Sequence, residues 1–174
     1  MKRNVVFCFV LFVCSACLLS CSKNSDELRF MGKNLSVSCK DFKNHLEDNG
    51  FKCEGSRVFK GEYLGENVDI LLEDEKNGHY NKMTIMLTSG GKTCEEYYEK
   101  ICKEIKKEHN GFKVKDKEEN DQISYTQESS GKDISIPISN KITEFYNDAG
   151  KKVHVSLYDA VLVSIVTAIY ELNS

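Results

Sequence analysis

The sequence predicts an α+β fold, in which one antiparallel sheet carries two helices packed on one face. Two segments combine helix-start signals with apolar residues at helical spacing. Several runs between and after them alternate apolar and polar residues, as half-buried strands do. The order helix, three strands, helix, several strands indicates two α-β-β-β-like repeats, about 28–90 and 91–174, within a single domain of residues 28–174.

The first predicted helix spans residues 39–49, after a short extended run at 28–31. Ser38 can accept hydrogen bonds from the first free amides, and Asp41 suits the positive end of a helix. Gly50 stands where a left-handed C-cap is expected. The apolar face of this helix consists of Cys39, Phe42 and Leu46.

Three predicted strands follow the first helix, at residues 57–63, 68–73 and 82–88. The third alternates most clearly, with Met83, Ile85 and Leu87 on its inner side. The turns between these strands are predicted at 64–67 and 74–78.

The second predicted helix opens at Thr93, which forms a capping-box pattern with Glu96, and ends at Gly111. Its buried stripe consists of Cys94, Tyr97, Ile101 and Ile105. Residues 147–150 are predicted to form a hairpin turn. The remaining strands are predicted at 112–117, 122–126, 133–138, 142–146, 152–158 and 161–171, with polar loops or frayed edges at 115–121 and 127–132.

Residues 1–20 are predicted to be a lipoprotein signal peptide. A basic start precedes an apolar run at 5–19, which is shorter than the roughly 20 residues that a bilayer span needs. Leu18-Leu19-Ser20-Cys21 resembles a bacterial lipobox. The resemblance implies cleavage before Cys21 and lipidation of that cysteine, with palmitate among its acyl chains. Residues 21–27 would then be a polar tether, and we expect export and a lipid anchor in the bacterial envelope, at the outer membrane.

Charge and cysteine spacing exclude several classes of function. The formal net charge is −3, and lysines are interleaved with acidic residues, so we expect no nucleic-acid partner. The spacing of Cys and His matches no zinc site, and we expect no metal or other cofactor. The candidate disulfide cysteines are Cys39, Cys53, Cys94 and Cys102. Cys94 and Cys102 fall on one predicted helix about 12 Å apart, too far to pair with each other.

Motifs spread over most of the chain carry a family resemblance. Phe30-Met31-Gly32-Lys33-Asn34-Leu35, Gly50-Phe51, Phe59-Lys60-Gly61 and the segment 153–158 resemble small, largely uncharacterised lipoproteins of gut anaerobes. Their repeated α-β-β-β layout is similar to the beta-lactamase inhibitory protein fold. The resemblance implies a binding or scaffolding module and transfers no catalytic residue.

The predicted function is therefore that of a non-catalytic, lipid-anchored module that holds a protein or glycan partner, or a second copy of itself, on its outward sheet face. The candidate residues of that face are Leu71, Met86, Tyr158, Val166 and Tyr170. One alternative is an envelope enzyme with Cys39 or Cys94 as nucleophile, because both stand at predicted helix starts. The other is a purely structural envelope accessory protein.

Overall fold

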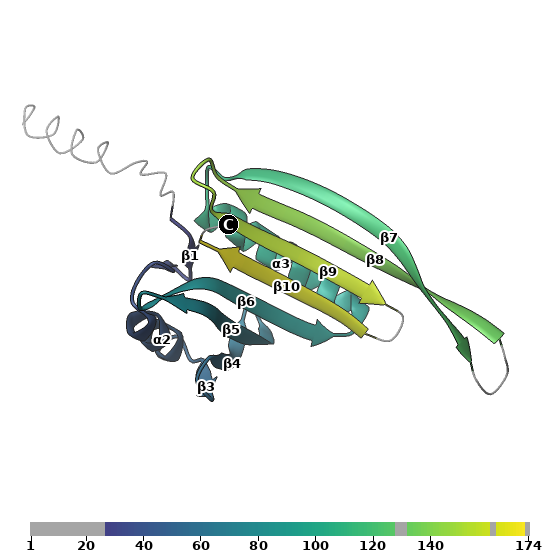
Figure 1. The fold of residues 1–174 in the computed structure, drawn as a ribbon, viewed down its shortest axis with the longest axis horizontal. Coiled ribbons are helices and arrows are strands. Elements are labelled where there is room, and N and C mark those ends of the chain that lie inside the picture. The colour runs from purple at the N-terminus through teal and green to yellow at the C-terminus, as the bar shows by residue number, and fades with distance from the viewer. Residues whose placement is uncertain (1–26, 128–131, 161–162, 173–174) are drawn as a thin grey trace, which may run out of the picture.

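An α+β architecture is confirmed by the structure, a computed structural model that describes residues 27–127, 132–160 and 163–172. Eight antiparallel strands form one large sheet in the order β3-β4-β5-β6-β10-β9-β8-β7 (Figure 1). Four consecutive strands make up each half, and the halves join where β6 pairs with β10.

The helices and the sheet occupy most of the described chain. A small separate hairpin precedes them, made of β1 (Arg29–Phe30) and β2 (Lys33–Asn34). The other elements are α2 (Cys39–Asp48), β3 (Lys52–Glu54), β4 (Val58–Tyr63), β5 (Glu66–Lys76), β6 (His79–Ser89), α3 (Gly91–Glu108), β7 (Lys113–Gln127), β8 (Lys132–Tyr146), β9 (Lys152–Ala160) and β10 (Val163–Glu171).

One face of the sheet forms the core. A single row of paired residues crosses five strands on this face, and every member is buried: Phe59, Ile70, Ile85, Ala168 and Val155. The buried stripes of both helices join the same cluster. The alternation predicted for β6 is confirmed, because Met83, Ile85 and Leu87 are all buried on this side.

Helix α2 begins and ends as its local sequence predicts. The Ser38 hydroxyl accepts a hydrogen bond from the Asp41 amide at 3.1 Å, so one of the free amides of the first turn is satisfied. At the other end Asn49 is the C-cap, and Gly50 follows with φ of 89°. A residue with a side chain would be strained in that left-handed conformation.

Helix α3 begins earlier than the capping-box pattern predicts. Its first residue is Gly91, its N-cap is Gly90, and no side chain caps it, so the prediction of Thr93 as the first cap is wrong. A distant segment lies against this first turn. A carboxylate oxygen of Asp159, on β9, lies 3.3 Å from where a Cβ on Gly91 would stand, which places a negative charge at the positive end of the helix.

Strands β7 and β8 form a much longer hairpin than the sequence predicts. They pair without interruption from Lys113↔Tyr146 to Gln127↔Lys132. The prediction of a polar loop or frayed edge at 115–121 is therefore wrong. In the second such segment, 127–132, Gln127 pairs with Lys132, and residues 128–131 lie outside the described chain. Figure 1 shows the far end of this hairpin extending beyond the rest of the sheet. Charged residues suit an edge strand such as β7, because its solvated side chains discourage pairing with another chain.

The β1–β2 hairpin ties the two helices together. The Arg29 amide donates to Nε2 of His109 at 3.0 Å, and the Gly32 amide donates to Glu108 Oε1 at 2.7 Å, both at the end of α3. On the other side, Nε2 of His45 on α2 donates to the Phe30 carbonyl at 3.2 Å. The predicted signal peptide and the lipidation site precede this hairpin and lie outside the described residues.

Candidate functional site

The face of the sheet opposite the helices is the candidate site. Along β5 and β6 its residues alternate with those of the core, so Leu71 and Met86 point outward with exposed fractions of 36% and 39%. On β9, Tyr158 has the same outward parity and is half-buried among its neighbours. The structure thus places these three predicted residues on the outward face.

The predicted outward direction of Val166 and Tyr170 is wrong. Val166 is 1% exposed and Tyr170 is fully buried. The register explains this, because Val166 pairs with Leu87 and Tyr170 pairs with Met83, and both partners lie in the core. Strand β10 is apolar on both faces, so its own periodicity could not show which face turns inward.

Three other residues of β10 take the outward positions. Ile165 pairs with Tyr158 across the sheet, Ile169 shares its parity, and Val163 is 40% exposed. The signal that could have found them is the alternation of β6. Once β10 is paired with β6 in register, the core residues of β6 determine which residues of β10 face inward.

Several polar side chains on the outward face bond to one another. Ser156 Oγ and Thr167 Oγ1 are 2.7 Å apart, and Thr84 Oγ1 donates to Glu73 Oε2 at 3.1 Å. At the border of the face, ion pairs join Lys82 to Glu73 and Lys152 to Glu171, and Nδ1 of His154 lies 3.5 Å from a carboxylate oxygen of Glu144. Covering this surface would bury apolar side chains, and it would also cover Asp69, which pairs with Met86 across the sheet and has no ion-pair partner within 4 Å among the described residues. We call Leu71, Met86, Tyr158, Val163, Ile165 and Ile169 the open face from here on.

All four candidate disulfide cysteines are free thiols in the structure. Cys39 lies on α2 and Cys53 on β3, in the first half of the fold. Cys94 and Cys102 both lie on α3, in the second half. No two of them are bridged. The predicted separation of Cys94 and Cys102 on one helix is confirmed.

Burial disfavours the thiolate form of three of these cysteines. It raises the pKa of Cys39, with a further contribution from the Glu75 carboxylate, and it raises the pKa of Cys94. It also raises the pKa of Cys102 to about 11. The Cys94 thiol donates to the Ser164 carbonyl at 3.3 Å. A catalytic cysteine needs the opposite shift, so these surroundings give no support to the nucleophile alternative.

Other chemical sites are sparse among the described residues. No group of three or more His, Cys, Asp or Glu side chains in the described ranges could hold a metal ion. Within those ranges, neither helix has the length and apolar character that a membrane crossing requires. Comparisons with protein-family models, curated proteins and solved structures found no match to this chain.

Proposed function

We propose that this chain is an exported, lipid-anchored and non-catalytic module of the bacterial envelope, and that it holds a protein partner on the open face. The single observation that carries the binding role is an eight-stranded sheet with helices on one side and exposed aliphatic and thioether side chains on the other. Exposed apolar side chains gathered on one face of a sheet are typical of interaction sites.

The chemistry of the open face favours a protein over a glycan. Its members are Leu, Met, Val and Ile with one Tyr, and the hydroxyls of Thr84, Ser156 and Thr167 beside them already bond to protein groups. A glycan would need free hydrogen-bonding groups, whereas protein interfaces combine an apolar centre with a polar border. Ion pairs supply that border here.

Two repeats remain part of the proposal, with four strands after each helix instead of the predicted three. Helix α2 precedes β3–β6, helix α3 precedes β7–β10, and the two meanders meet through their last strands. The likeness to the beta-lactamase inhibitory protein fold stays a proposal. A sheet built by two such units has a broad outer face, which is the surface that a binding module needs.

Site-specific photocrosslinking tests the binding role. A photoreactive residue replaces Met86 or Leu71 in the full chain, produced in its native cells. The matched control is Val114, which is equally apolar and 43% exposed but lies on an edge strand and pairs with the core residue Phe145. We expect one discrete heterologous product from positions 71 and 86 and none from 114.

Each other outcome of the crosslinking counts against the proposal. A product of twice the chain's mass would identify a second copy as the occupant. Loss of the product after glycosidase treatment would identify a glycan. Absence of any product from both outward positions would contradict the binding role and favour a structural accessory protein.

The lipid anchor needs its own experiment. We expect the wild-type chain to incorporate labelled palmitate and to sediment with the outer-membrane fraction, because Cys21 ends the lipobox-like segment. Cys21→Ala should abolish labelling, whereas Cys17→Ala should not. Labelling that survives Cys21→Ala would place the modification elsewhere and contradict the proposed anchor.

A further inference from the structure

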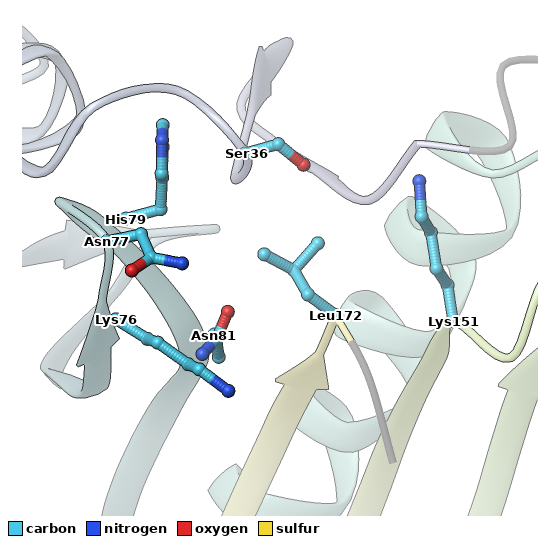
Figure 2. Close-up of a pocket in the computed structure, with 7 residues that line it drawn as sticks. All are labelled: Ser36, Lys76, Asn77, His79, Asn81, Lys151 and Leu172. Carbon is cyan, nitrogen blue, oxygen red and sulfur yellow. The ribbon is translucent and has the colours of Figure 1, made fainter.

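A polar hollow of about 630 Å³ lies at the end of the sheet, apart from the open face (Figure 2). Four separate chain segments form it: the linker after β2, the β5–β6 turn with the start of β6, the β8–β9 turn, and the end of β10. The lining side chains are Ser36, Lys76, Asn77, His79, Asn81, Lys151 and Leu172. Its volume falls in the range of small-molecule sites, about 300–1,000 Å³.

The β5–β6 wall is held by its turn and by the segment before α2. Lys76 pairs with His79 across a two-residue turn in which Asn77 and Gly78 have φ of 54° and 78°. Asn-Gly suits such a turn because both positions require positive φ. The Gly78 carbonyl accepts from the Cys39 amide at 2.7 Å, and Nδ1 of His79 donates to the Val37 carbonyl at 3.0 Å.

The other walls are held in the same way. The Leu172 amide donates to the Asn81 carbonyl at 3.0 Å, which joins the end of β10 to β6. The Lys151 amide donates to the Asn147 side-chain oxygen at 3.0 Å within the β8–β9 turn. The Ser36 amide donates to Oδ1 of Asn34 at 2.8 Å. The hollow is therefore preformed, so that a ligand would not have to order its backbone.

The charge of the hollow is positive in a chain whose net charge is −3. Among the described residues, Lys76 and Lys151 line it and no carboxylate does. Within the described residues neither lysine has a carboxylate partner within 4 Å. By contrast, the nearby Lys82 and Lys152 are paired with Glu73 and Glu171. Two lysines without partners around a polar hollow can attract an anion.

The two lysines stand on opposite sides of the hollow. Figure 2 shows Lys76 and Lys151 on different walls, with the Leu172 side chain between them and Asn77 and Asn81 on the Lys76 side. A single small anion placed at one lysine would leave the other unused. A ligand with negative groups at both ends could contact both lysines. The side-chain amides of Asn77 and Asn81 could then bond to hydroxyls in the middle of that ligand.

We propose that this hollow binds a sugar-sized molecule that carries anionic groups at two separated ends. Its concave shape argues against a flat bilayer surface, which would meet only the protruding tips of the lysines. The proposal stands on residues that are not part of the open face. It therefore does not depend on the protein-binding role, and variants of the hollow should leave crosslinking from Met86 unchanged.

Isothermal titration calorimetry with three probes tests the proposal. Fructose 1,6-bisphosphate carries two separated phosphates, glucose 6-phosphate carries one, and glucose carries none. With the full chain in detergent, we expect the bisphosphate to bind about tenfold more tightly than the monophosphate, a difference of about 1.4 kcal/mol, and glucose to give no heat.

Lysine variants assign the binding to the hollow. Lys76→Ala and Lys151→Ala should each weaken the bisphosphate to about the level of the monophosphate, with an unchanged circular dichroism spectrum. The matched control is Lys106→Ala on α3, an exposed lysine away from the hollow, which should change the affinity less than twofold.

Three results would overturn the proposal. They are no heat from the bisphosphate at about 10 mM, equal affinity for the bisphosphate and the monophosphate, and an equal loss in Lys106→Ala. An equal loss in Lys106→Ala would indicate general attraction of the bisphosphate to surface charge instead of binding at a site. Binding that disappears in physiological salt to the same extent for all variants would indicate the same.

Discussion

Ile85 and Ile165 offer a direct test of which face of the sheet the helices cover. The two isoleucines lie on the paired strands β6 and β10. Ile85 is 1% exposed in the core, whereas Ile165 is half-buried on the open face. Replacing each by alanine removes the same atoms from neighbouring central strands, so the two variants share the loss of β-propensity and differ in what surrounds the deleted atoms.

The expected magnitudes follow from burial. An Ile→Ala change removes three carbons, which amounts to about 2.4 kcal/mol of transfer free energy at full burial. The cavity left among the core side chains raises the cost of Ile85→Ala to about 3–4 kcal/mol. Ile165→Ala leaves a gap that water can fill, so we expect a loss of about 1–1.5 kcal/mol.

Urea unfolding followed by circular dichroism measures both values. Reductant should be present because the cysteines are free. The free energy of unfolding should fall by about 2 kcal/mol more for Ile85→Ala than for Ile165→Ala, with similar m-values. Equal losses, or a greater loss for Ile165→Ala, would show that something covers the outward face and would refute the open face as an available surface.

Four further outcomes are expected from individual side chains. Burial lowers the pKa of His109 below 6.5. The contribution of neutral His109 to stability is therefore complete above pH 6.5 and is lost as pH falls through the folded pKa. His109→Asn should flatten the fall in unfolding free energy between pH 7.5 and 5. Gly61→Ala should cost about 1–3 kcal/mol in urea unfolding, because its Cβ would stand 2.6 Å from the Phe51 ring. Tyr170→Phe should raise the unfolding free energy by about 1 kcal/mol, because the buried hydroxyl has no partner among the described residues. Iodoacetamide at pH 8 should alkylate the exposed Cys53 and spare Cys102, whose pKa is about 11, as mass spectrometry of the native chain would show.

For each of these four predictions, one result would contradict the reasoning. An unchanged pH slope in His109→Asn would assign the acid sensitivity to other groups. A neutral Gly61→Ala would mean that Phe51 moves without cost. A destabilised Tyr170→Phe would show that the hydroxyl has a partner, and rapid labelling of Cys102 would contradict its burial.

His109 holds the β1–β2 hairpin to the end of α3 only while its ring is neutral. Neutral His109 accepts from the Arg29 amide through Nε2 and donates through Nδ1 to the Ile105 carbonyl. Protonation of Nε2 would remove the acceptor, so acid should loosen β1 from the end of α3. The predicted tether joins the domain at this hairpin, so the same contact would bear any strain that the anchor transmits.

Local sequence patterns predicted the structure correctly wherever it depends only on residues close together in the chain. Ser38 and Gly50 bracket α2 because capping depends on groups within one turn of chain. The alternation of β6 identified its core residues because one face of that strand is apolar and the other is largely polar. For the same reason Leu71 and Met86 were found as candidates for the open face.

Contacts between distant segments decided the rest. The parity of Val166 depends on its pairing with β6, since β10 is apolar on both sides. The start of α3 lies beside the carboxylate of Asp159, a residue more than sixty positions away. The polar hollow needs four segments that meet only in the folded chain. Side-chain periodicity and capping are short-range properties that a sequence displays directly, whereas strand register and the convergence of turns exist only once the sheet has formed.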